Sequence, residues 1–237
     1  PTVWRLWGVP KALVVGNAMQ CAGDLALLGI ADKEVLPEVV LRVSEILTAS
    51  YLEMIEGQCM DLAFEARTAI NAEEYLEMIA FKTGALIRSG LEVGALLATD
   101  DPSAVRAFSR FGNCLGRAFQ IRDDYLGIWG DEATTGKAAG NDIRRRKKSF
   151  PVVFALSRAG GQTLDDLLQI YGKKELDNDD VDRVLAVLDA VGAREESQRL
   201  TGASAAEALQ ALEGVSLPTW ARSEAEELVD FLAKREY

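Results

Sequence analysis

The sequence predicts an all-α fold, and three observations support this prediction. Apolar residues recur at i, i+3, i+4 and i+7 through long stretches of the chain. No run alternates convincingly with the period of two that marks a strand, and helix-start and helix-stop residues separate the apolar stretches. Hydrophobic residues make up 49% of the 237 residues, which is enough for a substantial core. Because no internal repeat or long linker is found, we expect residues 1–237 to form one domain.

The first half of the chain is expected to contain four long helices. Two of them cover residues 9–30, which are mostly apolar, and residues 36–66, where the helical periodicity continues for many turns. The third begins at Asn71, which forms a capping-box pattern with Glu74, and is expected to end at Gly90. The fourth covers residues 101–130, because an aspartate followed by a proline is a favourable helix start.

The second half begins with a polar, glycine-bearing segment, residues 131–148, which is typical of a loop. Further helices are expected over residues 151–158, 163–171, 179–191, 193–213 and 218–234. We expect the long helices to lie in the core, since they are apolar most of the way round.

Composition excludes several classes of function. Acidic residues outnumber basic ones 37 to 26, and the net charge of -11 argues against a nucleic-acid binder. No apolar run approaches the roughly 20 residues of a membrane span, and the start of the sequence has no secretory signal pattern. The cysteines, Cys21, Cys59 and Cys114, lack metal-ligand spacing, so we expect thiols in the core of a reduced, cytoplasmic protein. The absence of histidine means that any metal site must be rich in oxygen ligands.

Two adjacent aspartates, Asp123 and Asp124, lie inside an apolar run, where unpartnered carboxylates are costly. Gln120 lies four residues before Asp124 and shares its helix face. Elsewhere Lys82 interrupts an apolar helix, and residues 131–148 supply further bases. A diphosphate with Mg²⁺ would satisfy both sets, because Mg²⁺ takes one or two carboxylates together with phosphate oxygens and lysines neutralise the remaining phosphate charge.

Several segments carry a resemblance to a known family. They are "GQCMDL" from Gly57, "KT" at Lys82, "GRAFQIRDDYLG" from Gly116 and "TGKAAGNDIRRRKKSFP" from Thr135. Their order and spacing resemble those of the trans-isoprenyl diphosphate synthases, the polyprenyl synthetase family. The resemblance covers nearly the whole chain, and its most specific part is the block from residue 119 to residue 151. It implies a helical bundle of the isoprenoid synthase type with a central apolar cavity, assembled as a homodimer.

The resemblance also implies an activity. Members of the family use Mg²⁺ to draw the diphosphate from an allylic substrate, and isopentenyl diphosphate attacks the resulting cation. The product is a longer isoprenyl diphosphate. Water must be excluded from such a cation, and we expect the helices around Phe111, Phe119 and Tyr125 to form an apolar wall.

The site residues follow from the resemblance position by position. Asp123 and Asp124 resemble the metal ligands of the family's second aspartate-rich motif. The residues implied to bind the substrate diphosphate are Lys82, Thr83, Gln120, Lys137 and Lys147. Lys82, Gln120, Asp123 and Asp124 would be the catalytic residues. Asp142 matches an aspartate in the same downstream segment.

The chain departs from the family pattern in two places. The last aspartate of the second D-D-x-x-D motif is replaced by Gly127, so we expect weaker or altered Mg²⁺ binding. No D-D-x-x-D occurs before Gly57, and "PTVWRLWG" at the start resembles the segment that follows the family's first motif. We therefore expect N-terminal helices to be missing, through truncation or natural variation, and little prenyl transfer from this chain alone. The resemblance implies that residues before the first motif set the product length.

Three functions remain open. The first is the prenyltransferase. The second is a terpene cyclase, which ionises an allylic diphosphate without a second substrate and is favoured by Gly127. The third is a non-catalytic partner subunit, which the missing motif favours and the retained lysines oppose. Simpler interpretations are that Asp142 caps a helix, that Gln58 and Asp61 are ordinary polar helix positions, and that the basic run is a solvated loop.

Overall fold

The computed structural model describes residues 1–30, 35–67, 70–130 and 140–235, and within these ranges it contains helices and turns but no strand. The all-α prediction is therefore confirmed. The chain divides into two compact units, residues 1–49 and 50–237, which we describe separately. The prediction of a single domain stays a prediction.

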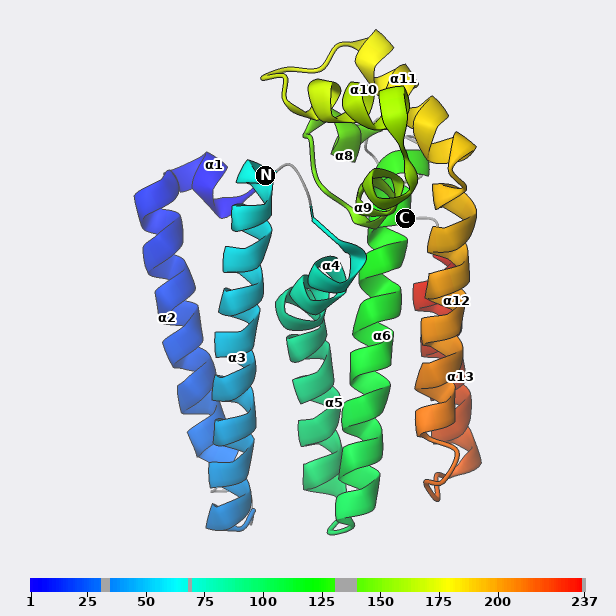
Figure 1. Cartoon of the computed structure of the whole chain (residues 1–237). Coiled ribbons are helices and arrows are strands. Elements are labelled where there is room, and N and C mark those ends of the chain that lie inside the picture. Colours follow the sequence, from blue (N-terminus) through cyan, green and yellow to red (C-terminus); the bar gives the residue numbers. More distant parts are fainter. Residues whose placement is uncertain (31–34, 68–69, 131–139, 236–237) are drawn as a thin grey trace. The chain divides into compact units, whose positions relative to one another are not determined.

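Figure 1 shows the order of the helices along the chain. The first unit holds α1 (Val3–Trp7), α2 (Val9–Leu28) and the start of α3 (Pro37–Ala66). The second unit holds the end of α3 and the helices α4 (Ala72–Ile79), η2 (Ala80–Gly84), α5 (Ala85–Ala98), α6 (Pro102–Trp129), α8 (Asn141–Arg144), α9 (Phe150–Arg158), α10 (Gly161–Tyr171), α11 (Asn178–Ala190), α12 (Ala193–Ala211) and α13 (Thr219–Lys234).

Helix α6 is central to the second unit, where it packs along α5 and along α12 (Figure 1). Two glycines of α6 allow α5 and the η2 turn before it to approach closely. A Cβ atom on Gly112 would lie 2.6 Å from the Cα of Arg88, and one on Gly116 would lie 2.7 Å from the Cα of Gly84. Only glycine fits such contacts between backbones. On the side of α12 and α13 the contact is an apolar cluster of Ala107, Phe111, Leu115, Ala208, Leu212 and Val229.

The short helices α8 to α11 cover the C-terminal end of α6. Their buried apolar side chains form one cluster with that end, made of Ile128, Ile143, Val152, Ala155, Leu167, Ile170, Val181, Val184, Leu188 and Ala193. Ile143 is fully buried, and it anchors the segment that follows residue 139 to the body of the unit. The same segment carries Asp142 and Lys147.

The predicted helix starts are confirmed. Asn71 accepts a hydrogen bond from the Glu74 amide at 2.8 Å, and the Glu74 carboxylate accepts one from the Asn71 amide at 3.1 Å. Asp101 caps α6 by accepting from the Ser103 amide at 2.8 Å.

Two predicted boundaries are wrong. The helix expected to stop at Gly90 continues to Ala98, because an interior glycine costs a helix only about 1 kcal/mol and packing against α6 outweighs that cost. The segment expected as a loop over residues 131–148 contains the helical turn Asn141–Arg144, which the buried Ile143 stabilises. Residues 131–139 lie outside the described part of the chain.

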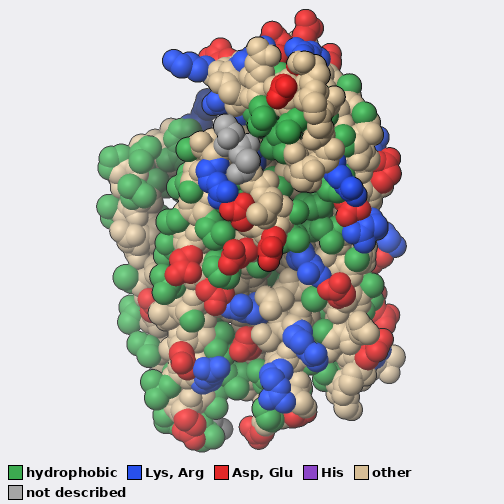
Figure 2. All heavy atoms as spheres, viewed as in Figure 1, with side chains coloured by type: hydrophobic (Ala, Val, Ile, Leu, Met, Phe, Trp, Pro, Cys, Tyr) green, Lys and Arg blue, Asp and Glu red, His purple; other side chains and the backbone are tan. Residues whose placement is uncertain are grey.

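Helices α1 and α2 have no buried residue, so the expectation that α2 is a core helix is wrong. Hydrophobic side chains gather along them in Figure 2, and the large exposed ones are Val3, Trp4, Leu6, Trp7, Val9, Leu13, Val14, Met19, Leu25 and Leu28. Within the described ranges, no helix combines the length and hydropathy needed to cross a membrane.

The expectation of core thiols is also wrong. Cys21 and Cys59 are exposed and Cys114 is half-buried, and all three are free. The two exposed cysteines lie on α2 and α3, and a thiol is small enough to be tolerated at an exposed helix position.

Candidate functional site

Lys82 and Thr83 lie on a π-helical turn, Ala80–Gly84, between α4 and α5. Such wide turns are frequent at functional sites. Two other helices hold this turn through glycines. A Cβ atom on Gly57 of α3 would lie 2.3 Å from the backbone nitrogen of Lys82, and Gly116 of α6 contacts the backbone of Gly84 in the same way. The turn is therefore fixed from two sides by direct backbone contact.

One helical turn after each glycine, a polar side chain meets the π-helical turn. Residues four apart share a helix face, so Asp61 follows Gly57 and Gln120 follows Gly116 on the same side. Lys82 Nζ donates to Asp61 Oδ2 at 2.5 Å, and Thr83 Oγ1 donates to Gln120 Oε1 at 2.6 Å.

Asp124 is fully buried, and its carboxylate is the acceptor of a complete polar network. Oδ2 accepts from the Tyr75 hydroxyl and from the Phe150 amide, the latter at 2.8 Å. Oδ1 accepts from Lys147 Nζ at 2.7 Å and from Gln120 Nε2 at 3.3 Å. These four donors compensate the loss of water around the carboxylate, which is why an aspartate is tolerated here.

The electrostatics of this network keep its donors protonated. Burial raises the pKa of the Tyr75 hydroxyl well above its usual value, and the charge of Asp124 raises it further. Burial opposes the charged form of Lys147, but the carboxylates of Asp124 and Asp142 outweigh this effect, and the pKa of the ammonium is raised. Both groups therefore remain donors at neutral pH.

Asp123 has a different environment although it is the neighbouring residue. Its side chain is 43% exposed and forms an ion pair with Arg235 at 3.2 Å. The guanidinium of Arg235 also lies over the ring of Phe119, 4.2 Å from its centroid. Because the carboxylate of Asp123 is partly exposed and lines a cavity, it is accessible to a ligand.

That cavity has a volume of about 310 Å³ and is strongly polar. It is lined by Asp61, Phe64, Glu65, Lys82, Asp123, Asp142, Arg145, Arg146, Lys147 and Lys148. These residues come from α3, the π-helical turn, α6 and the segment after α6. Mixed acids and bases around a small hollow suit an anion that is accompanied by a cation.

The structure brings together most of the site residues expected from the sequence. Lys82, Asp123, Asp142 and Lys147 line the cavity, while Thr83 and Gln120 lie beside it and pair with each other. Lys137 falls in residues 131–139, outside the described part of the chain.

Sequence reasoning missed part of the cavity wall, namely Arg145, Arg146 and Lys148, because a basic run by itself indicates a solvated loop. Lys148 Nζ donates to the carbonyl oxygens of Phe64 and Glu65, at 2.7 and 3.2 Å, and so caps the C-terminal end of α3. The sequence leaves the role of Asp61 open, although its spacing from Gly57 could have indicated a residue that faces the π-helical turn.

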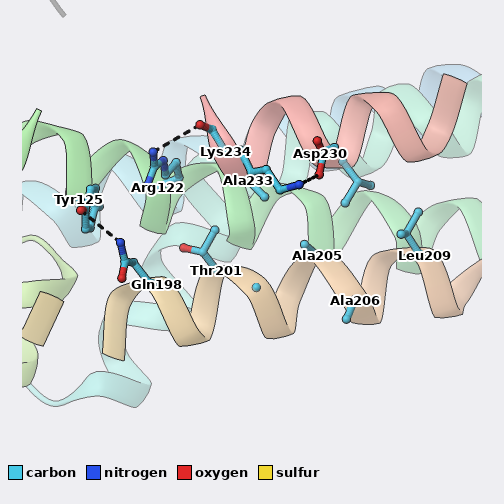
Figure 3. Close-up of a pocket in the computed structure, with 12 residues that line it drawn as sticks. Arg122, Tyr125, Gln198, Thr201, Ala205, Ala206, Leu209, Asp230, Ala233 and Lys234 are labelled. Carbon is cyan, nitrogen blue, oxygen red and sulfur yellow. Dashed lines mark hydrogen bonds and ion pairs between the residues drawn. The ribbon is translucent and has the colours of Figure 1, made fainter. Parts of the chain in front are cut away.

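The expected apolar wall does not line this cavity. Phe111 packs in the core between α6 and α12, and the ring of Phe119 is covered by a guanidinium. Tyr125 lines another cavity of about 550 Å³, between α6, α12 and α13, where Gln198 donates to its hydroxyl at 3.2 Å (Figure 3). Helical geometry directs Phe111 and Tyr125 away from the face of α6 that carries Asp123, whereas Phe119 lies one turn before Asp123 on that face and is covered by Arg235.

The donor set fits Mg²⁺ held jointly with a phosphate ligand. Among the described residues, no three acidic or cysteine side chains are grouped closely enough to hold a cation by themselves. Mg²⁺ commonly takes only one or two carboxylates when phosphate oxygens and waters complete its octahedron. Asp123 can supply one, whereas both oxygens of Asp124 already accept hydrogen bonds.

Comparison with known proteins identifies the family of the chain. Residues 1–188 match the family model described as Polyprenyl synthetase. The geranylgeranyl diphosphate synthase of Mycobacterium tuberculosis is 37% identical over 200 residues, which are 84% of this chain and 56% of that protein. The chain therefore spans little more than half the length of this relative.

Solved structures show the same fold. The geranylgeranyl pyrophosphate synthetase of Pyrococcus horikoshii aligns with a TM-score of 0.91 and 34% identity, over 100% of this chain and 70% of that chain. The geranylgeranyl pyrophosphate synthase of Corynebacterium glutamicum, complexed with isoprenyl diphosphate and magnesium, aligns with a TM-score of 0.84 and 29% identity, over 97% and 64% of the two chains. By its sequence match and its fold, the chain belongs to the polyprenyl synthetase family.

Proposed function

We propose that the protein is a prenyltransferase that condenses an allylic diphosphate with isopentenyl diphosphate to give a longer isoprenyl diphosphate. The observation that carries the proposal is the cavity in which Lys82, Asp123 and Lys147 converge from different elements. A structural core has no need for two lysines aimed at a common hollow, whereas a diphosphate does. The synthases to which the chain is similar support the choice of substrates.

Each residue has a proposed part in binding. Lys82 and Lys147 neutralise the diphosphate of the allylic substrate, and Thr83 and Gln120 provide hydrogen bonds beside it. Asp123 would hold Mg²⁺ together with the phosphate oxygens of the substrate. The bound metal supplies Lewis-acid stabilisation of the negative charge on the leaving diphosphate. Lys137 and Asp124 keep their proposed roles, as diphosphate and metal ligands, on the family resemblance alone.

The reaction then balances without a protein nucleophile. The bond between the allylic carbon and the diphosphate oxygen breaks, and its electron pair leaves with the diphosphate. The double bond of isopentenyl diphosphate forms the new carbon–carbon bond, and a proton is lost to the departed diphosphate. The lysines stabilise the charge that develops on the leaving group, where preorganised cations are most effective.

The test is to incubate the purified protein and Mg²⁺ with radiolabelled isopentenyl diphosphate and each allylic diphosphate in turn. Elongated, labelled diphosphates are the expected result, in small amount, because this chain has no D-D-x-x-D before Gly57. Hydrocarbons or alcohols formed without isopentenyl diphosphate would instead identify a terpene cyclase. No product with any allylic substrate would contradict both reactions and favour a non-catalytic partner subunit.

We further propose that the protein is a homodimer and is cytoplasmic. The exposed hydrophobic side chains of α1 and α2 support an interface, because a contiguous apolar surface is unfavourable in water. Free cysteines are in keeping with a reducing compartment. Sedimentation velocity should give twice the mass of one chain, and a monomer at micromolar concentration would contradict the dimer.

A further inference from the structure

The cavity between α6, α12 and α13 contains a hydroxyl group that the protein leaves without a partner. This cavity shares no lining residue with the polar cavity around Asp123. Thr201 lines it and is 4% exposed, and among the described residues its Oγ1 atom has no hydrogen-bond partner. Figure 3 shows the Thr201 side chain pointing from α12 into the cavity, with its oxygen toward the end where Tyr125 and Gln198 lie. A buried hydroxyl without a partner is unfavourable, so this one indicates a place for a ligand.

Two serines of the same helix form the bond that Thr201 lacks. Ser197 Oγ donates to the carbonyl of Ala193 at 2.6 Å, and Ser204 Oγ donates to the carbonyl of Leu200 at 2.8 Å. A carbonyl four positions earlier is a common partner for a hydroxyl inside a helix. Thr201 lies between the two serines and is turned toward the cavity instead, so its hydroxyl is available to a group that enters there.

Tyr125 supplies a second hydroxyl at the same end of the cavity. Its oxygen accepts hydrogen bonds from Arg194 Nε and from Gln198 Nε2, each at 3.2 Å. These bonds occupy the oxygen as an acceptor, and the described part of the chain supplies no acceptor for the hydroxyl proton. Two donors to one oxygen also polarise its O–H bond and strengthen it as a donor. The hydroxyls of Tyr125 and Thr201 therefore suit a ligand that accepts hydrogen bonds.

The charges around the cavity favour a ligand with a single negative charge. Its lining residues include two cations, Arg122 and Lys234, and one acid, Asp230, so they carry one positive charge in excess. Lys234 forms an ion pair with Asp230, while the guanidinium of Arg122 lies 4.7 Å from the centroid of the Tyr125 ring. A carboxylate has one charge and two acceptor oxygens. A diphosphate is less suitable, because its larger charge requires several cations.

The remainder of the cavity is apolar. Thr201, Ala205 and Leu209 are spaced by four residues and share one face of α12, and Val229 and Ala233 contribute from α13. Polar groups therefore occupy one end of this face and aliphatic side chains the other (Figure 3). The volume of about 550 Å³ is that of a typical site for a small molecule. An aliphatic chain would gain affinity from each methylene group that it buries there.

We propose that this cavity is a binding site for a medium-chain aliphatic carboxylate. The carboxylate oxygens accept hydrogen bonds from the hydroxyls of Thr201 and Tyr125, and the chain lies between α12 and α13 against Ala205 and Val229. The order of donors and apolar wall along the cavity matches the head and tail of such a molecule. The inference does not rest on the proposed function, because the two cavities have no lining residue in common.

The experiment is calorimetric titration of the purified full chain with sodium hexanoate, octanoate and decanoate at neutral pH. Octanoate is expected to bind at one site, and the affinity should rise about fourfold with each added methylene group. Octylammonium has the same chain and the opposite charge, so it should bind at least about tenfold more weakly than octanoate. Equal binding of octanoate and octylammonium would show adsorption to apolar surface and overturn the inference, as would no binding of octanoate at millimolar concentration.

Substitutions of Thr201 test the head-group contact. Thr201→Val keeps the shape and removes the hydroxyl, so octanoate should bind about tenfold more weakly, the effect of losing a hydrogen bond to a charged group. Thr201→Ser keeps the hydroxyl and should stay within about twofold of the wild type. Because the hydroxyl has no partner in the protein, Thr201→Val should not lower the midpoint of urea unfolding. A lowered midpoint, or unchanged affinity in Thr201→Val, would overturn the inference.

A matched pair of substitutions locates the chain of the ligand. Ala205→Leu adds three carbon atoms on the face of α12 that lines the cavity, and it should abolish octanoate binding. Ala98→Leu makes the same change at an exposed position of α5, beside a different cavity of about 720 Å³, and should leave the affinity unchanged. Loss of binding in Ala98→Leu with wild-type affinity in Ala205→Leu would place the ligand in that other cavity and overturn the inference.

Discussion

The two halves of α6 are held in place by different kinds of interaction. Toward its start and middle, glycines let the backbones of α5 and η2 come into direct contact with α6, and apolar side chains fill the space toward α12. In the second half, the buried carboxylate of Asp124 joins donors from three other parts of the second unit. One helix is thus fixed by shape at one end and by satisfied charge at the other.

The two kinds of interaction should also fail differently. A contact made by shape fails when volume is added, and the cost depends on how far the neighbour can move. A network made by charge fails when one member is removed, because the remaining members are left buried without partners. The site lies at the charged end, where directional hydrogen bonds fix each donor in one orientation.

The largest effect is expected from Asp124→Ala. This change leaves the Tyr75 hydroxyl, the Phe150 amide and the Lys147 ammonium without their common acceptor. Removing one partner of a buried charged pair costs about 3–5 kcal/mol, and urea unfolding should show a loss of that size. Asp124→Asn, which keeps the shape and part of the hydrogen bonding, should lose less. A loss below about 1 kcal/mol for the alanine variant would contradict the role of the network.

Asp123→Asn should separate binding from stability. Its carboxylate is accessible to a ligand, and its ion pair with Arg235 is partly exposed and contributes about 1 kcal/mol or less to folding. We expect prenyl transfer to fall about a hundredfold, equivalent to about 2.7 kcal/mol of barrier, with the urea midpoint nearly unchanged. Equal effects of Asp123→Asn and Asp124→Asn in both measurements would remove the distinction between the two aspartates.

Gly116→Ala tests the end of α6 that is fixed by shape. Its methyl group would lie 2.7 Å from the Cα of Gly84, and a backbone atom cannot move aside as a side chain can. Overpacking of this kind costs about 1–3 kcal/mol in unfolding experiments. The matched control is Gly94→Ala on α5, where there is open space and the higher helix propensity of alanine should add about 0.5–1 kcal/mol. Identical effects at the two positions would contradict the close approach.

Alkaline pH should gradually reduce the stability that the hydrogen-bond network around Asp124 provides. The pKa of Lys147 is raised above 10.5 and that of Tyr75 above 10.0, so the unfolded chain loses these protons at lower pH than the folded protein does. Their contributions are therefore complete below about pH 10 and decline as the pH rises further, by at most about 1.4 kcal/mol per pH unit for each group. Tyr75→Phe should give a shallower decline in urea unfolding between about pH 9 and pH 11, and an unchanged slope would contradict this assignment.

Patterns among residues close together in the sequence are sufficient to predict much of the fold. The caps at Asn71 and Asp101, and the pairing of Gln120 with Asp124 one turn later, depend only on residues a few positions apart. The π-helical turn at residues 80–84 could not be predicted, because the spacing of apolar residues does not reveal the additional residue that such a turn contains. The extension of α5 beyond Gly90 was missed because it depends on packing against α6.

The site was predictable where the family motif names a residue and not where tertiary contacts decide. Lys82, Asp123 and Lys147, which the motif names, line one cavity, and their roles stay predictions. The contact of Asp61 with Lys82 joins residues 21 positions apart on different helices. The position of the Asp142 carboxylate beside Gly127 requires the path of the segment after α6, which no pattern in the sequence specifies.

The π-helical turn between α4 and α5 sets the angle by which α5 is rotated about its own axis. Each residue of a regular helix advances the chain by about 100° around its axis. Deleting one residue between positions 80 and 84 would rotate α5 by that angle and turn Gly84 and Arg88 away from the glycines that receive them. This stretch should therefore accept changes of residue type far more readily than a change of length.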